Sequence, residues 1–346
     1  MSEGSALFAD IAVPRLTGTP GNERVREILK RELVARGFVV LEHAFPASPR
    51  PLRAVAIAGT LVAVASAGSA ALMVRPAGGA GWAALAFLVV AAVLALRPWR
   101  ALPESRAVTL VGVRPRTRVA AWLTAHYDSK GQPISMATRV AGVVLVALQL
   151  PALLGVAALG ASPGAALCFL PGVVGGLILA RNTATAGSPG ALDNASGVVT
   201  VLATVDALPP DSPVGVIFPD AEEWGLLGAK ALVRERANLL EGTAVVNFDG
   251  IDDRERTIAL VHRAGPIVDA VVRSLGTRPA RRLPVLEDGL ALARAARECV
   301  TIVRGDWRTA TVVHTPRDTV ARMTLAGSRA VAAAVARALR ETLPVR

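Results

Sequence analysis

Seven histidine and acidic side chains could act together on a substrate bond, because each lies in a short polar segment that directly follows an apolar run. The segments are TAHYDSKG, GALDNASG, FPDAEEWGLLG, VVNFDG and VVHTPRDT, and the side chains are His126, Asp128, Asp193, Glu222, Glu223, Asp249 and His314. In an open α/β sheet, ligands bind at the carboxyl ends of the strands. We therefore expect these segments to converge on one crevice.

The spacing within these segments suits a pair of divalent cations. His126 and Asp128 are two residues apart, so they share a face on extended backbone, and the carboxylate can hold the second ring N–H of the histidine. Glu222 and Glu223 are adjacent, so one can bind a metal while its neighbour acts as a base. Two histidines and three carboxylates, one of them bridging, are what two ions about 3.5–4 Å apart require.

Each segment also has a plainer interpretation when it is taken alone. A His-x-Asp sequence is more often a solvated loop, an Asp-Asn pair between Gly and Ser is usually an Asx turn, and paired glutamates often begin a helix. Asp249 could be a strand-end turn residue and His314 a surface histidine. The presence of all five segments in one chain favours a functional site, whereas the two other histidines, His43 and His262, are expected to be structural or superficial.

In this order the motifs resemble those of the M28 family of dizinc exopeptidases, over about residues 1–50 and 101–346. The segment PRLTGTPGNERVREILKRELVARGF also resembles the N-terminal helix region of that family. The resemblance implies five ligands for two ions: His126 and Asp249 for one, Glu223 and His314 for the other, and Asp193 as the bridge. It also implies that Asp128 orients His126 and that Glu222 is the general base. Zinc is the expected metal, although such ligands also suit cobalt or manganese.

Three features depart from the family pattern. Positions 127–192, 66 residues, separate His126 from Asp193, where relatives usually have a short loop. The single tyrosine, Tyr127, lies inside a metal motif, so the late tyrosine that stabilises the tetrahedral intermediate in several relatives has no counterpart. Candidates for its role are Arg304, Trp307 and Arg308. The segment LPVLEDGLALARAAREC lacks the Ser-Asp-His often found there, which leaves the substrate preference open.

The loop after His314 contains two further polar residues. Asp318 and Thr319 are expected to shape this loop and to cap the final helix.

Composition predicts membrane spans. The chain is 52% hydrophobic with a mean hydropathy of +0.47, although only 4% of its residues are aromatic. A bilayer core of about 30 Å needs roughly 20 helical residues. Four segments fit this length, in two hairpins: 54–74 with 77–96, and 140–159 with 164–180. The alternative is that these are buried core helices, but such helices rarely lack a polar face over this length.

The second hairpin accounts for the 66 residues between two metal motifs. The predicted boundaries are a peptidase domain at 1–50, 101–137 and 183–346, interrupted by transmembrane hairpins at 51–100 and 138–182. The loops on the far side of the spans carry one arginine, Arg75. Six arginines flank the spans on the side of the peptidase domain: Arg50, Arg53, Arg97, Arg100, Arg139 and Arg181. By the positive-inside rule the catalytic domain faces the cytoplasm.

Other global features agree with this topology. The N-terminus lacks a basic start followed by an apolar stretch, so no cleavable signal peptide is expected. Cys168 and Cys299 do not suggest a disulfide framework. The net charge of +11 could indicate nucleic-acid binding, but no basic patch is interleaved with aromatic residues, so an anionic membrane surface is the favoured cause.

After residue 187, strands and helices are expected to alternate, with a helix at ALARAAREC, 291–299, and a closing helix at 321–342. The expected fold class is α/β, with a mixed, mainly parallel central sheet covered by helices, plus four transmembrane helices. The expected function is that of a membrane-anchored, two-metal exopeptidase, an aminopeptidase first of all, acting on peptide substrates. Three alternatives stay open: a glutaminyl cyclase-like enzyme that processes another amide, a catalytically inactive peptidase-like scaffold in the membrane, and a metal-coupled transporter. Spans without charge make a poor ion pathway, which disfavours the transporter.

Overall fold

The computed structural model describes residues 3–73, 104–159, 163–254, 256–280 and 286–343, and the chain divides into two compact units. The sheet unit comprises Met1–Ser48, Pro103–Gly131 and Thr185–Arg346. The helical unit comprises Pro49–Leu102 and Gln132–Ala184. Two stretches of the helical unit are thus inserted into the sequence of the sheet unit, where the predicted insertions are 51–100 and 138–182.

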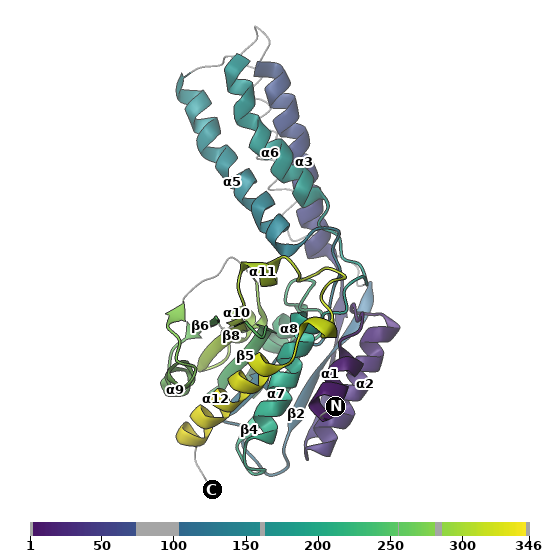
Figure 1. Ribbon diagram of the computed structural model, residues 1–346, viewed down its shortest axis with the longest axis vertical. Helices are drawn as coiled ribbons and strands as arrows, with labels where there is room; N and C mark the ends of the chain where they lie inside the picture. The colour runs from purple at the N-terminus through teal and green to yellow at the C-terminus, as the bar shows by residue number, and fades with distance from the viewer. Residues whose placement is uncertain (1–2, 74–103, 160–162, 255, 281–285, 344–346) are drawn as a thin grey trace. The chain divides into compact units, whose positions relative to one another are not determined.

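A mixed sheet forms the centre of the sheet unit (Figure 1). Its strands are Val39–Ala47 (β1), Ser105–Val113 (β2), Ala121–Thr124 (β3), Val214–Phe218 (β4), Ala244–Ile251 (β5), Thr257–Arg263 (β6), Pro279–Ala280 (β7) and Glu298–Arg304 (β8). Their order is β1-β2-β4-β3-β5-β8-β6-β7. The central strands β4, β3, β5 and β8 are parallel, while β1, β2 and β6 pair antiparallel. The predicted mixed α/β fold is confirmed.

Helices cover the sheet, because its central strands are apolar on both faces. The helices of the sheet unit are Glu3–Ile11 (α1), Pro20–Ala35 (α2), Ser196–Asp206 (α7), Leu227–Arg236 (α8), Pro266–Ser274 (α9), Asp288–Leu292 (α10), Trp307–Ala310 (α11) and Ala326–Thr342 (α12). Helix α12 contacts α7 and α9 in one layer (Figure 1). Helices α8 and α10 contribute Leu232 and Ala291 to a core around Trp122 and Val245 of the sheet.

Local sequence explains why α2 forms where it does. Thr19 is its N-cap and accepts a hydrogen bond from the backbone N–H of Asn22, and Pro20 occupies the first turn. Val25, Leu29 and Leu33 bury one stripe of the helix. The position of α2 matters for the site, because the segment before it enters the loops at the ends of the central strands.

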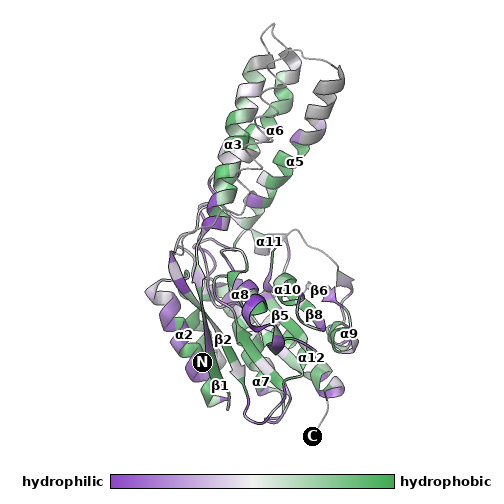
Figure 2. Cartoon of the chain, turned by 180° about the vertical axis from the view of Figure 1, so that it is seen from behind, coloured by the Kyte–Doolittle hydropathy of each residue, from purple (hydrophilic) through white to green (hydrophobic). Residues whose placement is uncertain are grey.

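The helical unit contains three described helices, Arg50–Met73 (α3), Met136–Leu159 (α5) and Leu170–Ala180 (α6), the last preceded by a 3₁₀ turn at Pro163–Phe169. In Figure 2, hydrophobic residues predominate along the coloured parts of these three helices. Within the described residues one helix, over Arg50–Ala71, is long and apolar enough to cross a membrane, and Met136–Gln149 and Ala166–Ala180 are shorter apolar helices. The predicted span 77–96, with Arg75, Arg97 and Arg100, lies outside the described residues.

Several predicted elements differ from the observed ones. The segment 291–299 is predicted as a helix, but α10 ends at Leu292 and β8 begins at Glu298. The closing helix is predicted from 321 and begins at Ala326. Helix α1 and strand β6 were not predicted from the sequence. Strand β6 is polar at both ends, and it is stabilised by antiparallel pairing with β8, which no local pattern announces.

Candidate active site

The seven predicted side chains come from the carboxyl ends of the central strands and the loops that follow them. His126 and Asp128 follow β3, which ends at Thr124. Glu222 and Glu223 follow β4, and Asp249 lies near the end of β5. The other two lie in loops, Asp193 directly before α7 and His314 after α11. Because parallel strands end at the same edge of a sheet, residues far apart in sequence meet there.

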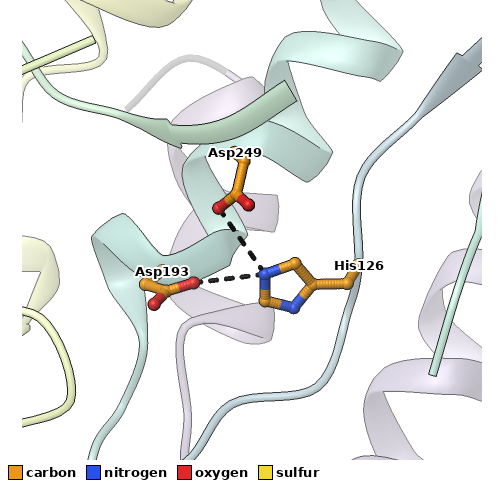
Figure 3. A group of neighbouring side chains, drawn as sticks. All are labelled: His126, Asp193 and Asp249. Atoms are coloured by element: carbon orange, nitrogen blue, oxygen red, sulfur yellow. Dashed lines mark ion pairs between the residues drawn. The ribbon is translucent and has the colours of Figure 1, made fainter. Parts of the chain in front are cut away.

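The first donor group consists of His126, Asp193 and Asp249 (Figure 3). The Nε2 atom of His126 lies 3.2 Å from Oδ1 of Asp193 and 3.8 Å from Oδ1 of Asp249. His126 is 2% exposed. All three side chains therefore point at one small volume that the protein closes off on the side of the imidazole.

The second donor group consists of Asp193, Glu223 and His314. The Nε2 atom of His314 lies 3.0 Å from Oδ2 of Asp193 and 3.1 Å from Oε2 of Glu223. Asp193 thus directs one carboxylate oxygen to each histidine. In both donor groups the ligand atoms lie within 4.8 Å of one another.

Asp128 has a wider role than the predicted orientation of His126. Its backbone oxygen lies 3.2 Å from Nδ1 of His126, and its Oδ1 lies 3.4 Å from the same nitrogen. Its two carboxylate oxygens also accept hydrogen bonds from the backbone N–H groups of Glu222, at 3.1 Å, and Glu223, at 3.2 Å. One buried carboxylate therefore joins the loop after β3 to the loop after β4.

The pKa values of the site follow from burial and crowding. Burial alone lowers the pKa of His126, but the charge of Glu222 and hydrogen bonds to three carboxylates outweigh it and raise the pKa well above its usual range. Burial raises the pKa of Asp193, but hydrogen bonds from His126 and His314 outweigh it and hold that pKa well below its usual range. Burial raises the pKa of Glu222 well above its usual range, because His126 compensates only in part.

The donor set fits a pair of divalent cations. Imidazole nitrogens and carboxylate oxygens are the ligands that zinc and similar ions take in proteins. Buried carboxylates of like charge oppose one another unless cations neutralise them. Here Asp193, Glu222 and Glu223 are all buried within one cluster. His126 and Asp249 would hold one cation, Glu223 and His314 the other, and Asp193 both.

Four functional candidates were not predicted from the sequence. Arg15 and Lys130 are buried cations, and Lys130 Nζ lies 2.6 Å from Oε2 of Glu223. Asp220 is fully buried and accepts hydrogen bonds from the hydroxyls of Thr17 and Tyr127. Asp288 is 1% exposed, and its carboxylate oxygens have no hydrogen-bond partner among the described residues. A polar residue beside a strand end, as in FPD and YDSK, was the available signal for Asp220 and Lys130.

The prediction for Asp318 and Thr319 was wrong in part. The final helix α12 has Leu325, not Thr319, at its N-cap position. Asp318 instead accepts hydrogen bonds from the backbone N–H groups of Leu192, at 2.7 Å, and Asp193, at 3.1 Å. It joins the loop of His314 to the loop of Asp193, and this contact spans more than a hundred residues of sequence.

The three candidates for stabilising the tetrahedral intermediate, Arg304, Trp307 and Arg308, have other contacts. Arg304 donates a hydrogen bond to Oγ1 of Thr257, and the guanidinium of Arg308 lies over the ring of Trp307, which is 71% exposed. That role stays a prediction. His43 pairs with Glu235 at the surface, and His262 lies 3.1 Å from Oγ1 of Thr301 and 3.3 Å from Oε1 of Glu287.

The mixed α/β fold is like that of zinc exopeptidases, and it brings together two donor groups that share Asp193. The family model of peptidase family M28 matches residues 108–339, which is more than half of the chain, so the chain belongs to this family. No curated protein sequence matches it.

Solved structures share the fold at low sequence identity. BSAP, a zinc aminopeptidase from Bacillus subtilis, has a TM-score of 0.59 and 12% identity, covering 98% of this chain and 94% of that one. A glutaminyl cyclase from Porphyromonas gingivalis has a TM-score of 0.59 and 14% identity, covering 98% and 96%. A Zn-dependent exopeptidase from Parabacteroides distasonis has a TM-score of 0.57 and 16% identity, covering 97% and 96%. The likeness extends to proteins of two different activities.

Proposed function

We propose that the protein is a two-metal aminopeptidase, anchored in a membrane by its helical unit, that releases residues from the N-termini of peptides. The observation that carries the proposal is Asp193, which directs Oδ2 to within 3.0 Å of His314 and Oδ1 to within 3.2 Å of His126. A carboxylate shared between two sets of ligands is what a pair of divalent ions requires. Membership of peptidase family M28 supports hydrolysis of an amide bond.

Two bound cations, zinc by preference, would polarise the scissile carbonyl and make the attacking water more acidic. The chain's own residues supply the rest of the chemistry. Glu222 takes a proton from the attacking water on its carboxylate and passes it to the nitrogen of the leaving amine. Asp128 holds the backbone of Glu222 in place.

Three observations support the membrane part of the proposal. Helix α3 has the length and composition of a span. Large apolar side chains are exposed on all three described helices of the helical unit, among them Val64, Leu148 and Leu177. The helices approach one another through glycines, which is typical of packing between membrane helices. A Cβ atom on Gly176 of α6 would lie 2.6 Å from the backbone oxygen of Gly59 in α3.

The four-span arrangement and a cytoplasmic catalytic unit belong to this proposal. They are supported by the apolar segments and by the arginines that flank them. Extraction of cell membranes with alkaline carbonate and then with detergent tests the anchoring. We expect the protein to stay in the membrane pellet until detergent is added. Two variants with an introduced cysteine, Arg75→Cys and Arg317→Cys, test the topology by thiol labelling. Of these two introduced cysteines, we expect only the one at position 317 to be labelled from the cytoplasmic side.

A peptide pool treated with the detergent-purified protein tests the activity. Products are identified by mass spectrometry, with N-acetylated peptides and a chelator as controls. Stepwise loss of N-terminal residues, blocked both by acetylation and by the chelator, is the expected result. Intact peptides after incubation with protein loaded with two metal ions would overturn the proposal.

A glutaminyl cyclase-like reaction is the second candidate, because solved glutaminyl cyclases share this fold as closely as the zinc aminopeptidases do. In that reaction the α-amine attacks the side-chain amide of an N-terminal glutamine and ammonia leaves. Peptides that begin with glutamine distinguish the two activities in the same assay. A cyclase removes the mass of ammonia and leaves the peptide length unchanged, whereas an aminopeptidase shortens the peptide by one residue.

A further inference from the structure

Arg15 is the most deeply buried arginine of the sheet unit's described residues, at 1% exposed. Its guanidinium donates hydrogen bonds to four backbone carbonyl oxygens. The Nε atom bonds the oxygen of Tyr127 at 2.6 Å, Nη1 bonds Pro189 at 2.5 Å and Val13 at 3.1 Å, and Nη2 bonds Gly190 at 2.9 Å. One side chain therefore joins the loop of His126 to the loop that leads into Asp193.

The backbone of Arg15 reinforces the same junction. Its carbonyl oxygen accepts a hydrogen bond from the N–H of Ser129, and its own N–H donates to Oγ of Ser129. That hydroxyl in turn donates to the backbone oxygen of Ser188. Arg15 lies outside residues 108–339, which match the family model, although it lies in the N-terminal segment that resembles the corresponding region of the family.

The chain needs such a junction because the two loops are not continuous. The helical unit's second stretch, Gln132–Ala184, is inserted between them. Where the chain leaves and re-enters the sheet unit, Gly131 and Thr185 exchange two backbone hydrogen bonds, of 2.6 and 2.8 Å. Arg15 adds a junction much closer to the metal-ligand positions, beside Tyr127 on one side and Gly190 on the other.

A second junction holds the other donor group, and it is made by a hydrogen-bond acceptor, whereas Arg15 is a donor. Asp318 accepts hydrogen bonds from the N–H groups of Leu192 and Asp193, and its own loop carries His314. Arg15 therefore ties Asp193 towards His126, and Asp318 ties Asp193 towards His314. The two donor groups share Asp193 but depend on different junctions.

We propose that Arg15 is a positioning residue that sets the first donor group, by holding the carbonyl groups of Tyr127, Pro189 and Gly190 on one guanidinium, while the second group is set by Asp318. The inference rests on the proposed function, since it concerns the binding of two cations. It goes further because it assigns a different positioning residue to each ion, Arg15 to one and Asp318 to the other. Arg15 lies outside the residues that the family model matches.

A conservative substitution separates the charge of Arg15 from its geometry. Burial lowers its pKa to about 10, so the side chain is a cation at neutral pH. A cation near the site repels divalent ions, so removing the charge would by itself tighten metal binding. Arg15→Lys keeps the charge, but an ammonium cannot reproduce the planar fork that reaches carbonyls on two loops. Weaker binding in Arg15→Lys therefore reports lost geometry.

The experiment measures Zn²⁺ binding to the metal-free, full-length protein by calorimetric titration. His314→Ala disables the second group, so in this background the titration reports the first group alone. His126→Ala does the reverse. Arg15→Lys is introduced into each background, and Arg31→Lys, on the exposed face of α2, is the matched control. Leu29→Ala, in the core beneath α2, controls for a general loss of stability.

We expect Arg15→Lys to weaken the first group at least about tenfold, the usual effect of removing a partner that orients metal ligands, and the second group less than about twofold. Neither control should change either affinity. Equal losses at both groups, or equal losses in Leu29→Ala, would show that Arg15 merely stabilises the fold and would overturn the inference. Wild-type protein that binds fewer than two ions would overturn the two-metal function instead.

Amide hydrogen exchange of the metal-free protein decides the inference independently of any metal. We expect Arg15→Lys to speed exchange at Ser129, whose N–H donates to the backbone oxygen of residue 15, and at Ala191, which directly follows the carbonyl group of Gly190 that loses its guanidinium partner. The amides of β8 should be unaffected in the same sample. Unchanged exchange in both loops would refute the positioning role, whatever the titrations show.

Discussion

The sheet unit and the helical unit bury polar groups in opposite ways. The sheet unit buries charged side chains in number, among them Arg15, Asp128 and Asp193, and joins them across long sequence distances. In the described part of the helical unit, buried polar contacts centre on pairs such as Ser66 with Gln149, whose side chains exchange hydrogen bonds of 3.0 and 2.9 Å.

The difference lies in what positions the backbone. In the sheet unit, guanidinium, carboxylate and amide groups hold loops at set distances. In the helical unit, glycines set the distance between helices because they lack a side chain. A Cβ atom added at Gly142 or at Gly175 would clash with the facing helix. Charged junctions suit a site that must present ligands to cations. Glycine contacts suit helices that pack where hydrogen-bonding partners are scarce.

The largest expected effect is on turnover in the sheet unit. Glu222→Gln removes the proton acceptor but none of the five predicted ligands, so peptide hydrolysis should fall by about 10²–10⁴-fold while two ions still bind. Initial rates and metal content by elemental analysis check this. Activity within a factor of about three of wild type would exclude Glu222 as the general base.

The next effect breaks the packing of the helical unit. A Cβ atom on Gly176 would lie 2.6 Å from two backbone atoms of α3, so Gly176→Ala should destabilise that unit by about 1–3 kcal/mol. The matched control is Gly68→Ala, because a Cβ atom there meets nothing within 4 Å, and removal of a helical glycine should stabilise it by about 0.5–1 kcal/mol. Unfolding in detergent, followed by circular dichroism, measures both.

The same pair of variants sharpens the comparison between the units. Zn²⁺ affinity of the sheet unit should be unchanged in Gly176→Ala and in Gly68→Ala. Equal destabilisation by both substitutions would mean that helix propensity, and not close approach, decides the outcome.

A smaller effect depends on pH and lies in the sheet unit. Burial, aided by the charge of Asp128, raises the pKa of Asp220 from 3.8 to about 6. A raised carboxyl pKa means that the folded state binds the proton more tightly. Its contribution to stability is therefore full below pH about 4 and is lost as the pH rises through about 6.

Asp220→Asn cannot titrate, so it isolates this contribution from other buried carboxyl groups. The difference in unfolding free energy, wild type minus variant, should decrease steadily between pH 4 and pH 6 and level off above it. Urea unfolding at several pH values measures the difference. A difference that does not change with pH would contradict the raised pKa.

The smallest effect concerns the polar pair of the helical unit. Ser66→Ala leaves the buried amide of Gln149 without its hydroxyl partner and should destabilise by about 1 kcal/mol. Replacing both partners, as Ser66→Ala with Gln149→Leu, should recover most of that loss, because no buried polar group is then left unpaired. Detergent unfolding of the two variants beside wild type tests the recovery.

Local pattern predicted the regular elements well where burial and periodicity agree. The sequence shows apolar runs at β3, β4 and β5, because both faces of these strands are buried. It also shows the amphipathic stripe of α2, because one face of that helix is buried. Strand β6 and the short helix α10 were missed or misassigned, since their state depends on pairing with β8 and on packing against the sheet. The four-span prediction goes beyond the described residues, among which one helix, over Arg50–Ala71, passes the test of both length and apolar composition for a span.

The sequence by itself determined which types of candidate ligand the site contains and the order in which they occur, because each follows an apolar strand whose end must meet the others at one edge of the sheet. Only the tertiary structure decided that Asp193 turns one oxygen to each histidine, that Asp128 and Asp318 bind backbone N–H groups, and that Arg15 joins two loops. The physical reason is distance along the chain. Strand burial is a local property of a few residues, whereas these contacts join residues more than sixty positions apart and exist only once the whole sheet has formed.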